Sequence, residues 1–119
     1  MERLAPLCRA GELAEGRSRG FDPTGTGRDT LFVVRRKGLY AYRNACPHWA
    51  ETSMAWRKDA FLNADATRIV CAAHGAQFEI ETGVCTLGPC LGQALTPVPL
   101  TTDGDGMLRV DLSFLETST

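Results

Sequence analysis

The two histidines of the chain, together with the cysteines beside them, constrain its fold more than any other feature. His48 follows Cys46 at a spacing of two in ACPHWAE, and His74 follows Cys71 at a spacing of three in CAAHGAQFEIETG. No third histidine is present in the sequence. Thiolate and imidazole ligands favour zinc, copper or iron–sulfur chemistry over hard cations such as magnesium. A fold that uses the four residues together must bring two short loops, separated by residues 49–70, to one place.

Several kinds of site are compatible with these pairs. Each pair alone fits a small buried cysteine beside a structural histidine, and a catalytic Cys–His pair would leave the second pair unexplained. A structural zinc site of the Cys₂His₂ type needs four such ligands, but its usual sequences place two cysteines in one loop and two histidines in the other. In a two-iron cluster, thiolates bind one iron and imidazoles bind the other. A loop that reaches along such a cluster supplies one cysteine and one histidine. The pattern favours this cluster, with the structural zinc site as the main alternative.

Composition restricts the class of protein. The chain has 119 residues, 44% hydrophobic content, 23% charged content and a formal net charge of −1, so we expect one globular domain and no nucleic-acid partner. No apolar run has the length of a membrane span, and the first residues do not resemble a secretory leader. We therefore expect a cytoplasmic protein without a membrane segment. In a reducing compartment its five cysteines are expected to be ligands or thiols, and Cys85 and Cys90 two buried thiols rather than a disulfide.

Short apolar or alternating runs, separated by Gly, Pro, Asn and Asp, predict an all-β fold. Two hairpins are expected, over residues 30–42 with a turn at Lys37–Gly38 and over residues 76–89 with a turn at Thr82–Gly83. Further strands are expected in TRIVCAAHG, ALTPVPL and MLRVDLSFL. Residues 16–29 are predicted to be a surface loop because of their glycines and proline. For residues 49–68 a short helical turn and an extended excursion are equally compatible.

The ligand pairs resemble those of a known family. CPH at 46–48, CAAHGAQFEIETG at 71–83 and GP at 88–89 are similar to the two ligand loops and the proline loop of Rieske-type ferredoxins. LCRAGEL and GFD resemble the opening of such a protein, and ALTPVPL and LRVDL its closing strands. The resemblance implies one Rieske domain over residues 1–119, with stacked antiparallel sheets. A small cluster-binding subdomain, about residues 45–90, would be inserted between two parts of a basal domain, about residues 1–44 and 91–119.

The same resemblance implies the cofactor and its ligands. One Rieske 2Fe-2S cluster per chain is expected, with Cys46 and Cys71 on the buried iron and His48 and His74 on the outer iron. Gly75 would let the second loop turn tightly without a clash at Cβ. Pro89 would belong to a third loop that covers the cluster.

The residues around the second loop predict a low reduction potential. High-potential members of the family offer a serine and a tyrosine hydroxyl to the cluster, and a disulfide joins their two loops. This sequence has Ala76 and Phe78 at the matching positions, so both hydroxyls are missing. Fewer hydrogen bonds leave the more negative, reduced cluster less stabilised. We expect a potential of about −150 mV rather than about +300 mV.

The function implied is electron transfer without catalysis. The mononuclear iron of an oxygenase needs two further histidines and a carboxylate, and no glycine-rich nucleotide-binding motif is present. We expect a one-electron carrier that links a reductase to an oxygenase or other redox enzyme. Its redox partners would dock near His48 and His74, with these candidate apolar contacts: Pro47, Trp49, Leu87 and Pro89. The alternatives are an accessory small subunit of a larger reductase, such as nitrite reductase, and a structural zinc-binding interaction module.

Overall fold

The computed structural model describes residues 4–45, 54, 58–71, 75–88 and 90–114 of the chain. These residues form three antiparallel sheets, with strand orders β1-β9-β8, β2-β3-β4 and β5-β6-β7. The strands are β1 (Leu4–Arg9), β2 (Arg17–Phe21), β3 (Leu31–Arg35), β4 (Leu39–Arg43), β5 (Arg68–Cys71), β6 (Ala76–Glu79), β7 (Cys85–Leu87), β8 (Leu100–Thr102) and β9 (Met107–Asp111). Helical structure in the described residues is restricted to two short 3₁₀ turns, Ala10–Glu12 and Leu112–Phe114. The all-β prediction is confirmed.

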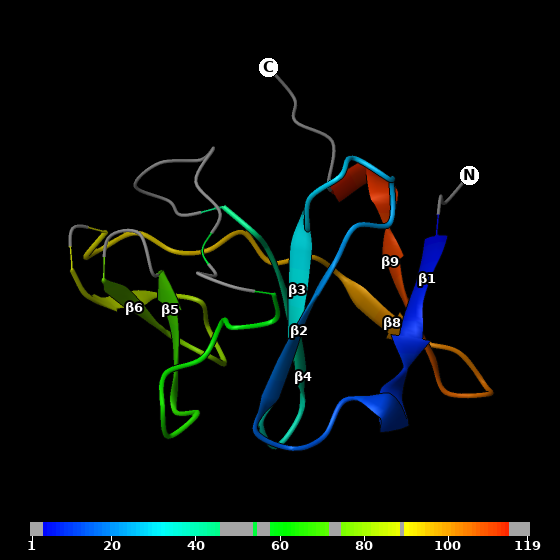
Figure 1. Ribbon diagram of the computed structural model, residues 1–119, viewed down its shortest axis with the longest axis horizontal. Helices are drawn as coiled ribbons and strands as arrows, with labels where there is room; N and C mark the ends of the chain where they lie inside the picture. Colours follow the sequence, from blue (N-terminus) through cyan, green and yellow to red (C-terminus); the bar gives the residue numbers. More distant parts are fainter. Residues whose placement is uncertain (1–3, 46–53, 55–57, 72–74, 89, 115–119) are drawn as a thin grey trace.

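The sheet β2-β3-β4 lies between the other two sheets (Figure 1) and contributes to two hydrophobic cores. Phe32 and Val34 of β3 face the core shared with β5-β6-β7, whereas Leu31 and Val33 face the core shared with β9. Because successive side chains of a strand point to opposite faces, a strand between two cores must be apolar throughout. This explains the uninterrupted run LFVV, whose four residues are all fully buried.

Both hairpins expected from the sequence are present. β3 and β4 pair from Leu31–Arg43 to Arg35–Leu39, and Lys37 adopts the left-handed backbone conformation of a tight turn, with φ 57°. β6 and β7 are joined through the turn at Thr82–Gly83, where Gly83 has φ 74°. A side-chain carbon at Gly83 would lie only 2.7 Å from the ring of Tyr42. The second hairpin therefore packs tightly against β4.

The loop predicted over residues 16–29 is in part a strand. Arg17–Phe21 forms β2 and pairs with β3 over its whole length, while the loop begins at Asp22, whose carboxylate accepts the amide N–H groups of Thr26 and Gly27. The sequence RSRGF has no apolar alternation, so it gives no strand signal of its own. β2 is a strand because its backbone pairs with β3. The prediction was therefore wrong for residues 17–21.

The run ALTPVPL is mostly not a strand. β8 begins only at Leu100 and continues through Thr102, and the preceding residues form isolated bridges at Ala94 and Pro97. Proline has no N–H to donate to a neighbouring strand, so Pro97 and Pro99 prevent a continuous ladder. The strand is displaced toward the C-terminus of the predicted run.

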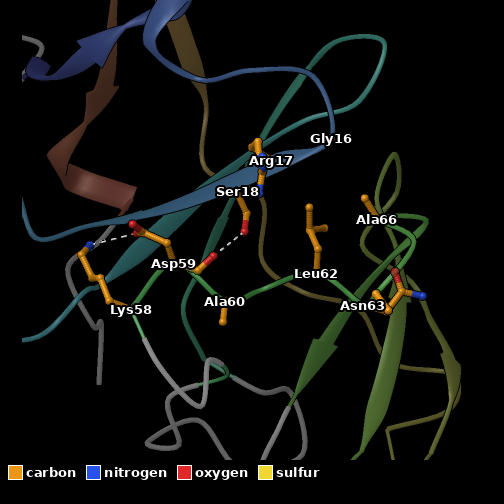
Figure 2. A pocket seen from close by; sticks show the side chains of 10 residues that line it. Gly16, Arg17, Ser18, Lys58, Asp59, Ala60, Leu62, Asn63 and Ala66 are labelled. Carbon is orange, nitrogen blue, oxygen red and sulfur yellow. Dashed lines mark hydrogen bonds and ion pairs between the residues drawn. The ribbon is translucent and has the colours of Figure 1, made fainter.

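Where the structure describes it, the segment between the two ligand pairs forms no helix and is an irregular excursion with turns at residues 58–59 and 64–65. Residues 58–66 run along β2, where Ser18 donates its hydroxyl hydrogen to the carbonyl oxygen of Asp59 at 2.7 Å (Figure 2). The Asp59 carboxylate accepts the Gly20 N–H at 2.8 Å. The Phe61 ring stacks on Phe32 with 4.3 Å between centroids. We call residues 58–66 the docked arm, because hydrogen bonds and a buried aromatic ring attach them to the middle sheet.

Candidate metal centre

The second ligand loop starts at the end of β5, where Cys71 is fully buried. Cys71 pairs with Ala76 at the base of the β5–β6 hairpin, and its carbonyl oxygen accepts the Gly75 N–H at 2.8 Å. Gly75 has φ 70°, and no atom beyond its chain neighbours lies within 4 Å of a side-chain carbon placed there. Glycine is therefore favoured at this position by its left-handed backbone, not by contact with another segment. His74 lies outside the described residues.

The third loop packs against the base of the second. Gly88 follows β7 with φ 104°, and a side-chain carbon there would lie 2.8 Å from the Cα of Ala76. Only glycine allows this approach of two backbones. Cys90, two residues later, is fully buried, and the Leu91 N–H donates to the Gly88 carbonyl at 3.2 Å. Pro89 lies outside the described residues.

The two ends of the first ligand loop are joined by a buried side chain. The Asn44 side-chain oxygen accepts the Met54 N–H at 2.9 Å, and the Asn44 amide group donates to the carbonyl oxygen of Asp29 at 3.0 Å. Asn44 and Met54, which flank residues 45–53, are therefore neighbours in the structure. The proposed ligands of this loop, Cys46 and His48, lie outside the described residues, as do Pro47 and Trp49.

The bases of the three loops meet in one hydrophobic core. Met54 after the first loop, Cys71 and Ala76 at the second, and Cys90 in the third all belong to the core between the middle sheet and β5-β6-β7. A buried thiol at a strand end, beside backbone turns at Gly75 and Gly88, fits a soft-metal cluster. Within the described ranges no three His, Cys, Asp or Glu side chains gather to hold a metal ion, and three of the four predicted ligands lie outside those ranges.

The remaining described cysteines are structural. Cys85 is a buried thiol outside any disulfide, and it donates to the Leu87 carbonyl at 3.3 Å. The structure thus has no Cys85–Cys90 disulfide, as expected. Cys8 is buried in the other core, where burial raises the pKa of its thiol.

Two features of the site were missed by sequence reasoning. Asn44 hydrogen-bonds Asp29 and Met54, and its sequence signal was an asparagine placed directly after the strand LYAYR. Leu91 is 68% exposed, and Leu87, which was predicted as a contact, is 55% exposed. The two leucines flank the turn at Gly88 and give the third loop an apolar surface; the signal for Leu91 was an apolar residue inside a glycine-rich turn.

A groove of about 550 Å³ lies between β2 and the docked arm. Figure 2 shows its polar side chains, of which Ser18, Lys58, Asp59 and Asn63 already bond to protein atoms. The groove therefore marks the contact between β2 and the docked arm, and we do not assign it a ligand. Elsewhere in the described chain, no helix combines the length and the apolar character needed to cross a bilayer.

Comparison with known proteins identifies the family. Residues 3–103 match the family model of the Rieske [2Fe-2S] domain. The chain is 32% identical over 98 residues to the cytochrome bc1 complex Rieske iron-sulfur subunit of Corynebacterium efficiens; the match covers 74% of this chain and 22% of that subunit's length. Among solved structures, it is similar to the ferredoxin of carbazole 1,9a-dioxygenase from Nocardioides aromaticivorans IC177, with 29% identity, a TM-score of 0.64, and coverage of 90% of this chain and 97% of that one.

The Sphingomonas yanoikuyae B1 ferredoxin shares the fold, with 22% identity, a TM-score of 0.66, and coverage of 92% of this chain and 98% of that one. The family match covers strands β1 to β8 and the three loop regions, and it ends before β9. The chain belongs to the Rieske [2Fe-2S] domain family, and its cofactor is a Rieske-type 2Fe-2S cluster.

Proposed function

We propose that this chain is a ferredoxin-like one-electron carrier that takes an electron from a reductase and passes it to an oxygenase or another redox enzyme. The observation that carries the proposal is the likeness, over 97% of that protein's length, to the ferredoxin of a dioxygenase. The chain itself performs no oxygen chemistry in this proposal. Its two histidines are both needed for the cluster, which leaves none for the two-histidine, one-carboxylate site of a mononuclear iron.

A second candidate is a role in a respiratory complex, which the 32% identity to a cytochrome bc1 subunit favours. The two candidates differ in the reduction potential that they require. Ala76 and Phe78 are fully buried and have no hydroxyl group. Without those hydrogen-bond donors the reduced cluster is less stabilised, which supports a low-potential ferredoxin over the respiratory role.

We infer that Cys46 and Cys71 supply the thiolates of the cluster and that His48 and His74 supply the imidazoles. Each loop then offers one ligand of each kind, as a cluster with two differently coordinated irons requires. When bound, the cluster accepts and returns one electron; the protein holds it and limits its contact with water. The sheet β5-β6-β7 lies within residues 45–90, which supports their assignment as the cluster-binding subdomain, with residues 1–44 and 91–119 as the basal domain.

A cysteine pair tests the ligand set. Cys71→Ser removes a proposed ligand, and Cys85→Ser removes a buried cysteine from the same core that is not a proposed ligand. We expect two irons and two sulfides per chain in the wild type and in Cys85→Ser, and loss of both from Cys71→Ser. Iron in Cys71→Ser at the wild-type level, or one zinc ion in the wild type, would contradict the assignment.

We propose that the redox partner docks on the third loop, beside the cluster. Leu87 and Leu91 form an exposed apolar surface there, and redox encounters use small, transient interfaces. The variants Leu87→Ser and Leu91→Ser test this surface, with Leu4→Ser on β1, at 41% exposure, as the matched control. Electron transfer to the partner enzyme should be slower in Leu87→Ser and Leu91→Ser but not in Leu4→Ser. Reduction by dithionite should be unchanged in all three variants. Equal partner kinetics in the three variants would exclude this docking surface.

The cytoplasm is the proposed location. Cys8 and Cys85 are buried thiols outside any disulfide, which is typical of a reducing compartment. Fractionation of cells that produce the protein tests this proposal, since recovery with the membranes would contradict it.

A further inference from the structure

Asn44 is the only buried polar or charged residue within the described part of the chain, with 5% of its surface exposed. It follows β4 directly, two residues before the proposed ligand Cys46. Its backbone N–H donates to the Thr30 carbonyl at 2.9 Å, in addition to the side-chain bonds to Asp29 and Met54. A buried amide group is costly unless it is hydrogen-bonded. These bonds therefore fix the Asn44 side chain in one orientation.

Asp29 anchors both sides of the first ligand loop. Its carbonyl oxygen accepts the Asn44 amide group at 3.0 Å, and its carboxylate accepts the Lys58 ammonium group at 3.0 Å. Lys58 also donates to the Gly20 carbonyl at 2.7 Å. Asn44 and Lys58, which flank residues 45–57, thus both contact the same residue of the loop before β3. Gly20 permits this arrangement, because a side-chain carbon there would overlap the Asp29 carboxylate.

We propose that Asn44 is a positioning residue for the cluster: by bridging Asp29 and Met54, it holds the loop that carries Cys46 and His48 in its metal-binding conformation. This inference rests on the ligand set proposed above. A loop whose two ends are fixed loses less conformational freedom when its ligands bind. Mutation of residues that orient metal ligands without touching the metal typically lowers metal affinity by about 10- to 100-fold.

Two substitutions separate the contacts of Asn44. Asn44→Asp keeps an oxygen to accept the Met54 N–H but sets a second oxygen against the Asp29 carbonyl. Asn44→Leu has a similar size and removes the side-chain bonds to Asp29 and Met54. We expect the cluster to be lost from Asn44→Leu about 10 to 100 times faster than from the wild type, with Asn44→Asp in between. The EPR lines of the reduced protein should broaden in the same order, since a less fixed loop lets the ligands adopt a range of positions.

Asn63 provides a matched control. Its side-chain oxygen accepts the backbone N–H groups of Thr67 and Arg68 at 2.9 and 3.0 Å, so it also closes a turn through a backbone-bonded amide. Asn63→Leu should lower the thermal midpoint without broadening the EPR lines. The test is the half-life of cluster absorbance, measured with an iron chelator well below the thermal midpoint of each variant, together with EPR of the dithionite-reduced proteins.

The outcomes are distinguishable. Wild-type half-life and line shape in Asn44→Leu, or equal broadening in Asn63→Leu, would overturn the positioning role and leave the ligand set intact. If Asn44→Leu does not fold, Asn44→Asp decides in the same way. Retention of iron by Cys71→Ser would instead overturn the ligand set on which the inference rests.

Discussion

The hydroxyl of Tyr42 joins the middle sheet to the β6–β7 hairpin, and its removal has a calculable effect. Tyr42 is buried on β4 and donates to the Ile80 carbonyl at 2.7 Å. Tyr42→Phe keeps the ring against Gly83 but leaves the Ile80 carbonyl unpaired. Loss of one partner of a buried hydrogen bond costs about 1–2 kcal/mol, which for a chain of this size corresponds to a fall of about 3–10 °C in the thermal midpoint.

The same hydroxyl makes this difference depend on pH. Burial, with smaller contributions from Tyr40 and Glu81, raises the pKa of Tyr42 to about 12 from its ordinary value of 10. Between pH 10 and pH 12 the unfolded state therefore binds fewer protons than the folded state, and the free energy of unfolding falls as pH rises. The slope contributed by Tyr42 is at most about 1.4 kcal/mol per pH unit. The advantage of the wild type over Tyr42→Phe should be constant below pH 10 and disappear by about pH 12.

Thermal scans of the cluster-loaded wild type and Tyr42→Phe, at matched scan rates from pH 7 to pH 12, measure this difference. Tyr40→Phe, on the same strand, controls for the loss of a tyrosine below pH 10, where the charge of Tyr40 does not act on Tyr42. Equal midpoints at pH 8, or a difference that stays constant to pH 12, would refute the role given to the hydroxyl.

Three further predictions follow from the packing and the site. Phe61→Ala should lower the free energy of unfolding by about 3–5 kcal/mol, because it removes a buried ring stacked on Phe32. Urea denaturation measures this change, and a value below about 1 kcal/mol would contradict docking of the arm. Gly88→Ala should accelerate loss of the cluster, because the added side-chain carbon would lie 2.8 Å from the Cα of Ala76. Visible absorbance measures this loss, and a wild-type rate would show that the third loop accommodates a side chain at this position. Redox titration should give about −150 mV for the wild type and a higher value for Ala76→Ser, which restores a hydroxyl donor; a wild-type value well above zero would contradict the low-potential assignment.

The features predictable from sequence are those determined by neighbours along the chain. The run LFVV and the turns at Lys37 and Gly83 identify two hairpins, because strand alternation and left-handed turn positions are local properties. The pairing of each histidine with a cysteine is equally local, and it identified the family that the comparison then confirmed.

The features that sequence did not predict depend on partners far along the chain. RSRGF is a strand only because β3 lies beside it. The docked arm is held by hydrogen bonds to Ser18 and Gly20, about forty residues earlier. Asn44 acquires its role through backbone groups of two other segments. None of these partners is visible in a window of sequence.

The central claim is that one cysteine and one histidine from each loop hold a two-iron cluster. Pulsed EPR of the dithionite-reduced protein tests it most directly, because the electron spin couples to nitrogen atoms bound to iron. We expect a rhombic signal with two coupled imidazole nitrogens, one of which disappears in His48→Cys. A reduced protein without histidine nitrogen couplings, or one that contains zinc and gives no signal, would contradict it.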